Sequence, residues 1–220
     1  RRVVDRFEYF RSAIGRDVEL GNDVHELFPP IDAIGFAKDV EQYHPFFLED
    51  LFAPEDGEYF RIVRQQTSVP MAMGELFVSP HEWVPLITER LIDYIRVRVS
   101  KTGGLTPCRK IVGLCETFGA HTAWQEGGDN DPVNQMAAAH LDLSSWCFGI
   151  QEENHFAIGM FFSGRLVHSD VQIKWKEPCL CPTRSSGRVS NCLMVALTSS
   201  PFRCLEIWTD SDAANRYDVR

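Results

Sequence analysis

Six short apolar segments alternate with longer amphipathic segments up to residue 155, and this alternation limits the possible folds most. The candidate strands are residues 18–26, 45–52, 70–76, 94–100, 121–126 and 147–153. The candidate helices between them are residues 30–42, 55–66, 80–92, 105–118 and 131–144. Successive strands begin about 25 residues apart, which is too far for hairpins and suits βα units with parallel strands. Six such units favour an α/β fold of the TIM-type (β/α) barrel class over a doubly wound sheet, and no glycine-rich phosphate motif follows any strand.

Composition excludes several classes of protein. The 220 residues carry a net charge of −9, which argues against a broad nucleic-acid surface. No apolar run approaches the ~20 residues that span a bilayer, and the first fifteen residues have the pattern of an amphipathic helix, not of a signal peptide. We therefore expect no membrane partner and a cytoplasmic location.

The character of the chain changes near residue 155. Residues 1–155 hold 14 basic and 25 acidic residues and three cysteines, whereas residues 156–220 hold 8 basic and 6 acidic residues, four cysteines and eight serines. We expect two parts: a partial (β/α) barrel that carries the site over residues 1–155, and an atypical C-terminal tail over residues 156–220. Our hypothesis is that this tail is frameshifted or poorly ordered.

Ionisable residues stand at nearly every predicted strand end, which in such barrels is the rim that carries the active site. Asp23, Glu49 and Glu75 are spaced evenly by 26 residues. Carboxylates that converge in this way repel one another unless a cation lies between them, and Mg²⁺ prefers oxygen ligands. Because side chains alternate along a strand, we expect His25 to point to the same side as Asp23. For the same reason we expect Asp50 to point away from Glu49 and to bond a neighbouring backbone group or an arginine.

These residues lie in sequence motifs that resemble those of the mannonate dehydratase family of the enolase superfamily, which includes the related starvation-sensing proteins. The motifs are "NDVHE", "FFLED", "MGELF", "LIDYIRVRVSKTGG", "TAW" followed by "GGD", and "CFGIQEENHF", over residues ~15–155. The resemblance implies a barrel behind a separate capping domain and Mg²⁺-dependent dehydration of acid sugars. It also implies that this chain holds strands three to eight of the barrel without the capping domain.

The resemblance implies a role for each matched residue. Asp23, Glu49 and Glu75 would bind Mg²⁺, and His25 would protonate the departing 3-hydroxyl group. The expected substrate-binding residues are Arg96, Gln125, Asp129 and Glu152, and Arg96 would help hold either the substrate or a neighbouring carboxylate. The implied reaction converts D-mannonate or a related aldonate, such as gluconate, into a 2-keto-3-deoxy acid. The proton-abstracting base belongs to the part of the family that precedes residue 1, and the full-length family implies a homo-oligomer.

One departure from the family concerns Gln125. The resemblance implies a histidine at the end of the seventh strand, paired with the aspartate four residues later, whereas here Gln125 precedes Asp129. Glutamine can hydrogen-bond a hydroxyl group but cannot exchange a proton near neutral pH. Two hypotheses therefore stay open: part of an acid-sugar dehydratase, or a non-catalytic relative that keeps the metal site and acts as a sensor or interaction protein.

Overall fold

A parallel sheet with helices along its outer side forms the body of the protein. The computed structural model describes residues 2–16, 18–126, 132–152, 195–197 and 205–207. Five strands pair in chain order, and every neighbouring pair is parallel. They are β1 (Asn22–Asp23), β2 (Leu48–Glu49), β3 (Met71–Met73), β4 (Tyr94–Ile95) and β5 (His121–Thr122).

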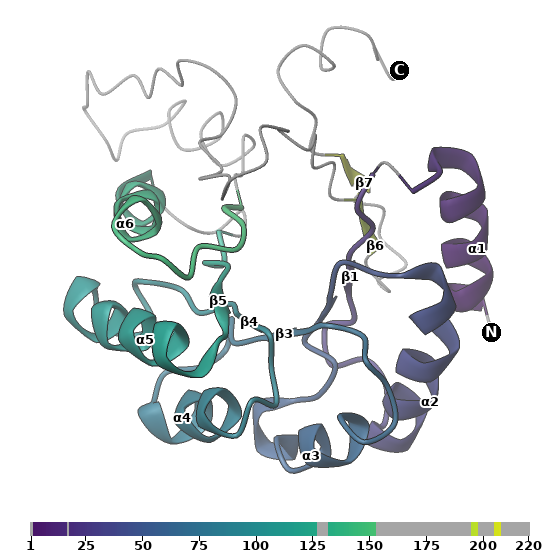
Figure 1. Ribbon diagram of the computed structural model, residues 1–220, viewed down its shortest axis with the longest axis horizontal. Helices are drawn as coiled ribbons and strands as arrows, with labels where there is room; N and C mark the ends of the chain where they lie inside the picture. The colour runs from purple at the N-terminus through teal and green to yellow at the C-terminus, as the bar shows by residue number, and fades with distance from the viewer. Residues whose placement is uncertain (1, 17, 127–131, 153–194, 198–204, 208–220) are drawn as a thin grey trace, which may run out of the picture.

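The helices follow the strands one by one and lie outside the sheet (Figure 1). They are α1 (Arg2–Ile14), α2 (Pro30–Val40), α3 (Tyr59–Val63), α4 (Pro80–Thr88), α5 (Leu105–Phe118) and α6 (Pro132–Leu143), with 3₁₀ turns at Glu41–Tyr43 and Pro54–Asp56. This arrangement is that of part of a TIM barrel and confirms the predicted fold class. Among the described helices, none has both the length and the apolar character that crossing a bilayer requires.

The strands are shorter than the sequence predicts, but backbone pairing continues past their ends. The N–H of Arg96 donates to the carbonyl of Met73 at 2.8 Å, and the N–H of Gln125 donates to the carbonyl of Val97 at 3.2 Å. The predicted sixth strand is reduced to a single parallel bridge between Thr122 and Phe148. The extended segments after each strand therefore keep the side chains at the rim in a defined order.

A short antiparallel pair from the C-terminal part of the chain lies beside the sheet. It consists of β6 (Val195–Leu197) and β7 (Leu205–Ile207), and β6 lies next to β1 (Figure 1). The rest of the predicted tail, residues 156–220, lies outside the described residues, so the predicted two-part division of the chain stays a prediction.

Local sequence signals explain where the helices begin and end. At the start of α4, the carboxylate of Glu82 accepts the N–H of Ser79 at 2.7 Å, while the Ser79 hydroxyl accepts the N–H of His81 at 3.4 Å. This capping box satisfies N–H groups that have no partner inside the helix. Helix α5 ends at Gly119, whose φ of 84° suits glycine and whose N–H bonds to the carbonyl of Cys115.

The core lies between the sheet and the helices. Leu48 and Met71 on the strands are fully buried and belong to the same hydrophobic cluster as Ala37 of α2 and Ile111 of α5. Burying each large apolar side chain of this kind contributes about 1.5–3 kcal/mol to the stability of the fold. The core fixes the strands, and the polar side chains beyond their carboxyl ends are fixed with them.

Candidate metal centre

The parallel register brings two of the predicted metal ligands side by side. Asp23 on β1 pairs with Glu49 on β2, and each is the last residue of its strand. Glu75 follows β3 by two residues. Gly74, between them, has a φ of 142° and packs against the backbone of Val97, where an added Cβ would lie 3.1 Å from the Val97 nitrogen. Glycine is therefore required at the turn that aims Glu75.

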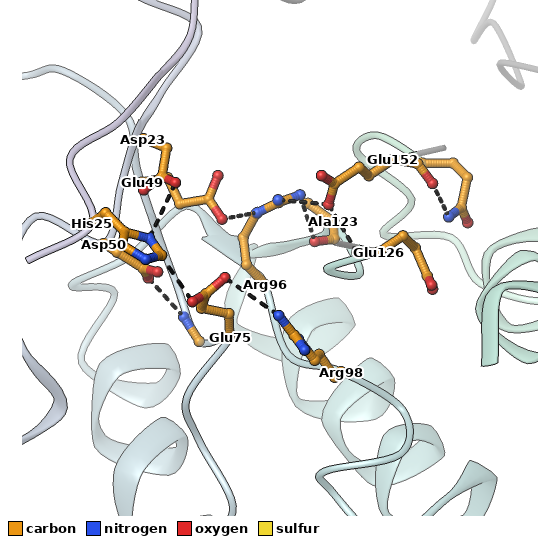
Figure 2. A network of polar contacts seen from close by, with 12 residues as sticks. Asp23, His25, Glu49, Asp50, Glu75, Arg96, Arg98, Ala123, Glu126 and Glu152 are labelled. Carbon is orange, nitrogen blue, oxygen red and sulfur yellow. Dashed lines mark hydrogen bonds and ion pairs between the residues drawn. The ribbon is translucent and has the colours of Figure 1, made fainter. Parts of the chain in front are cut away.

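His25 lies against these carboxylates, as the sequence predicts. Its Nδ1 lies 3.3 Å from Oδ2 of Asp23 and 3.9 Å from Oε1 of Glu75 (Figure 2). The reason differs from the prediction, because β1 ends at Asp23 and His25 has a left-handed backbone with φ of 53°. A turn, and not strand alternation, therefore directs the imidazole toward the metal site.

The predicted direction of the Asp50 side chain is wrong, although its predicted bond to a neighbouring backbone group is present, since its Oδ1 accepts the N–H of Gly74 at 3.4 Å. Its carboxylate does not point away from Glu49: an oxygen of Asp50 lies within 4.8 Å of ligand atoms of Glu49 and Glu75, and also of Asp23 and His25. The physical reason is that β2 ends at Glu49 and Asp50 has a φ of 44°, so the alternation of side chains stops there. Asp50 belongs to both groups of candidate ligands, whereas Asp23 falls in one group and Glu49 and Glu75 fall in the other.

Arg96 links the carboxylates of two distant segments. Its Nε donates to Oε1 of Glu49 at 2.6 Å, its Nη2 donates to Oε2 of Glu152 at 2.8 Å, and its Nη1 donates to the carbonyl of Ala123 at 3.3 Å (Figure 2). The guanidinium is 2% exposed and lies over the ring of Phe47. This geometry supports the predicted role beside carboxylates, and contact of Arg96 with a substrate stays a prediction.

Two cations beside Glu75 were missed by the sequence reasoning. Nη2 of Arg98 lies 3.8 Å from Oε2 of Glu75 (Figure 2). Nζ of Lys101 donates to the backbone carbonyl of Glu75 at 3.0 Å. A signal was present in the alternation of "YIRVRVS", since Arg96 and Arg98 share one side of an extended segment. Arg98 lies near Oε2 of Glu75, whereas His25 lies near Oε1.

The remaining predicted residues lie further along the rim. Gln125 is buried at the end of the extended segment after β5, and the N–H of Glu126 donates to Oε2 of Glu152 at 2.8 Å. The carboxylate of Glu126, also missed, accepts the side-chain amide of Asn134 at 3.1 Å. Asp129 lies outside the described residues, so its predicted role stays a prediction.

Burial shapes the electrostatics of the carboxylates. It raises the pKa of Glu49 to about 8, with Arg96 acting in the opposite direction, and it raises the pKa of Asp23. Burial and then the charge of Glu49 raise the pKa of Asp50 well above its ordinary value. Burial opposes the charge of Arg96, but Glu49 and Glu152 outweigh it and raise the pKa of the guanidinium. Asp23, Glu49 and Asp50 therefore take up a proton more readily than ordinary carboxylates do.

A hard divalent cation suits this donor set. Oδ1 of Asp23 is buried without a hydrogen-bond partner among the described residues, which is costly unless a cation takes that place. The neighbouring donors are carboxylate oxygens, the ligands that Mg²⁺ prefers. The residues present therefore fit a Mg²⁺ ion, and the catalytic role predicted for His25 stays a prediction.

Known proteins match about two thirds of this chain. A relative from Paenibacillus sp. (strain JDR-2), named a D-galactonate dehydratase family member, is 59% identical over 150 residues, which are 68% of this chain and 37% of the relative. A D-galactonate dehydratase family member of Pantoea ananatis is 52% identical over 146 residues, 66% of this chain and 35% of the relative. The chain thus spans little more than a third of the length of these relatives.

Solved structures agree with these matches. The crystal structure of an enolase from Pantoea ananatis with bound D-gluconate and Mg has a TM-score of 0.69 and 47% identity, and the match covers 72% of this chain and 39% of that one. A mandelate racemase/muconate lactonizing enzyme-like protein from Rubrobacter xylanophilus has a TM-score of 0.64 and 30% identity, with 70% and 38% covered.

The family model described as "Enolase C-terminal domain-like" matches residues 1–177. The predicted membership of the enolase superfamily is confirmed. The mannonate dehydratase family that the sequence resembles is not supported by the matches, because the named relatives are D-galactonate dehydratase family members. Carboxylates at three successive strand ends of a partial TIM barrel, with an imidazole against them, lead to the same assignment as the match. The chain belongs to the enolase C-terminal domain-like family.

Proposed function

We propose that this chain is the barrel part of a Mg²⁺-dependent dehydratase of acid sugars. The single observation that carries the proposal is the cluster of Asp23, Glu49, Asp50 and Glu75 at the strand ends with His25 against it. The matched relatives support the class of reaction through their family name, and a matched structure supports the ligand through its D-gluconate and Mg.

Each residue has a distinct part in the proposed chemistry. Asp23, Glu49 and Glu75 would hold Mg²⁺, which when bound would make the C–H next to the substrate carboxylate acidic enough to ionise. The C2 proton would go to a basic group of the full-length protein that is not among these candidate site residues. His25 protonates the 3-hydroxyl as its C–O bond breaks, so that water leaves. The enol that results tautomerises to a 2-keto-3-deoxy acid. Arg96 keeps Glu49 in place from the side away from His25.

The substrate is an aldonate, a chain of hydroxyl-bearing carbons ending in a carboxylate. D-mannonate is the substrate that the sequence resemblance implies. D-gluconate, bound in the matched Pantoea ananatis structure, differs from it at carbon 2, and D-galactonate is the acid in the relatives' name. We propose D-mannonate or D-gluconate, because the sequence resemblance implies the first and a matched structure holds the second.

The test is turnover by the full-length gene product. D-mannonate, D-gluconate and D-galactonate are each supplied with MgCl₂, and 2-keto acid is measured as its semicarbazone. His25→Asn should lower kcat at least ~100-fold, the usual loss for a general acid, while Mg²⁺ binding stays within a few-fold. Glu49→Gln should abolish both. His81→Asn, an exposed histidine at the start of α4, is the matched control and should leave both unchanged.

Gln125 favours a second candidate function. The resemblance implies a histidine at this place, and glutamine cannot take its part in proton transfer. A non-catalytic relative that binds Mg²⁺ and acts as a sensor or interaction protein would show Mg²⁺ binding without turnover. If Gln125→His in the full-length protein gains no turnover either, this second function is favoured. Turnover by the unaltered protein excludes it.

The setting of the protein is part of the proposal. We propose a cytoplasmic homo-oligomer whose partner molecule is a small acid sugar, not a nucleic acid or a membrane. Light scattering coupled to size-exclusion chromatography measures the assembly of the full-length protein, and a monomer would contradict that part.

A further inference from the structure

Asp50 lies beside the candidate metal centre, and its backbone bonds to two other segments of the chain. It is 1% exposed, directly follows Glu49, and its N–H donates to the carbonyl of Ala72 at 3.0 Å. Its own carbonyl accepts the N–H of Glu26 at 2.9 Å. The backbone of Asp50 therefore joins β3 to the segment that follows β1.

The side chain of Asp50 reaches the turn before Glu75. Its Oδ1 accepts the N–H of Gly74 at 3.4 Å, as the dashed line in Figure 2 shows. Gly74 lies close to the segment after β4, because a Cβ added to it would meet the backbone of Arg96 and Val97 at 3.1 Å. The turn is thus held on one side by packing and on the other by the Asp50 carboxylate.

A carboxylate in this place is otherwise unfavourable. It is buried, and its oxygens lie within 4.8 Å of ligand atoms of Glu49 and Glu75. Burial of a charge among like charges costs free energy unless hydrogen bonds or a cation offset it. The left-handed φ of 44° further limits the choice of residue, since aspartate and asparagine accept it more readily than most. An amide in place of the carboxylate would keep both the conformation and the acceptor oxygen.

We propose that Asp50 is a positioning residue that sets the place of Glu75 relative to Asp23 and Glu49 by accepting the Gly74 N–H. The inference rests on the proposed function, because the position of Glu75 matters through Mg²⁺. Hydrogen-bond acceptance carries the role, and the negative charge of Asp50 does not. Residues that orient metal ligands typically change metal affinity by about 10- to 100-fold when they are altered.

Three variants separate acceptance from charge. Asp50→Asn keeps the acceptor oxygen and removes the charge. Asp50→Glu keeps the charge and displaces the carboxylate by one methylene group. Asp50→Gly accepts the left-handed backbone and removes the acceptor. The probe is MgCl₂ alone, titrated into the full 220-residue chain by calorimetry, and urea unfolding in EDTA measures stability separately.

The expected result is a Kd for Mg²⁺ within about 3-fold of the unaltered chain for Asp50→Asn, and at least about 10-fold weaker for Asp50→Glu and Asp50→Gly. If Asp50→Asn weakens binding as much as Asp50→Gly, or if Asp50→Glu binds normally, charge is the role and the inference is overturned. Lower stability in EDTA with unchanged Kd in the Glu and Gly variants also overturns it. Absence of Mg²⁺ binding by the unaltered chain would instead overturn the proposed function, and the inference with it.

Discussion

Replacing Arg96 with methionine should cost stability in a way that depends on pH. The guanidinium bonds Glu49 at 2.6 Å and Glu152 at 2.8 Å, and the three side chains are 2%, 7% and 11% exposed. Removing one partner of a buried ion pair leaves the other charge without compensation, which typically costs about 3–5 kcal/mol. Methionine keeps the length of the side chain and removes the charge.

The pKa of Glu49 decides how much of that cost appears at a given pH. Its folded pKa is raised from 4.5 to about 8, so the folded protein holds this proton more tightly than the unfolded chain. The stability associated with the proton is complete below pH 4.5 and is lost as the pH rises to 8. Without Arg96, which lowers this pKa, the loss continues above pH 8. We therefore expect Arg96→Met to cost about 1.5–3 kcal/mol at pH 6, from the charged hydrogen bonds alone, and about 3–5 kcal/mol at pH 9.5.

Urea unfolding in EDTA at the two pH values measures the difference. Glu49→Gln combined with Arg96→Met removes the titrating group, so the cost of losing Arg96 should no longer rise with pH in that background. Arg61→Met is the control, because Arg61 pairs with Glu58 and Glu89 in solvent and should change stability little at either pH. An equal cost of Arg96→Met at pH 6 and 9.5, or a rise that persists beside Glu49→Gln, would refute the reasoning.

Three further predictions concern burial, packing and the metal. Burial raises the pKa of Asp142 from 3.8 to about 7, so its contribution to stability should fall between pH 4 and 7 by up to about 4 kcal/mol, and Asp142→Asn should flatten that part of the pH profile measured by urea unfolding. Gly74→Ala places a Cβ 3.1 Å from the Val97 nitrogen, so it should lower stability by about 1–3 kcal/mol. It should also weaken Mg²⁺ binding, measured by calorimetry, at least about 10-fold. Gly35→Ala is the control and should not weaken binding, because a Cβ at Gly35 has no atom within 4 Å. Mg²⁺ at about 100 times its Kd should stabilise the folded chain by about 2.7 kcal/mol in urea unfolding, and EDTA should reverse this; an unchanged midpoint would contradict a site in the folded state.

The failures of the sequence reasoning lie where strands end. The directions of the His25 and Asp50 side chains were predicted from the alternation of side chains along continuous strands. In the structure, β1 ends at Asp23 and β2 ends at Glu49. Past those points both residues adopt a left-handed backbone, which turns Asp50 into the cluster instead of away from it. Sequence patterns do not reveal the last paired residue of a strand, because pairing depends on the neighbouring strand. Arg98 was missed although its place, two residues after Arg96, carried the signal.

The sequence by itself determined the order of elements, the parallel sheet and the rim on which Asp23, Glu49 and Glu75 would meet, since these follow from periodicity and from a regular spacing along the chain. Only the tertiary structure decided which side chains contact one another there. Arg96 meets Glu152 across 56 positions of the sequence, and Asp50 meets Gly74 across 24. Such contacts depend on strand register and on the backbone angles of single residues. A shift of the register by one residue moves every side chain of a strand to the other face of the sheet.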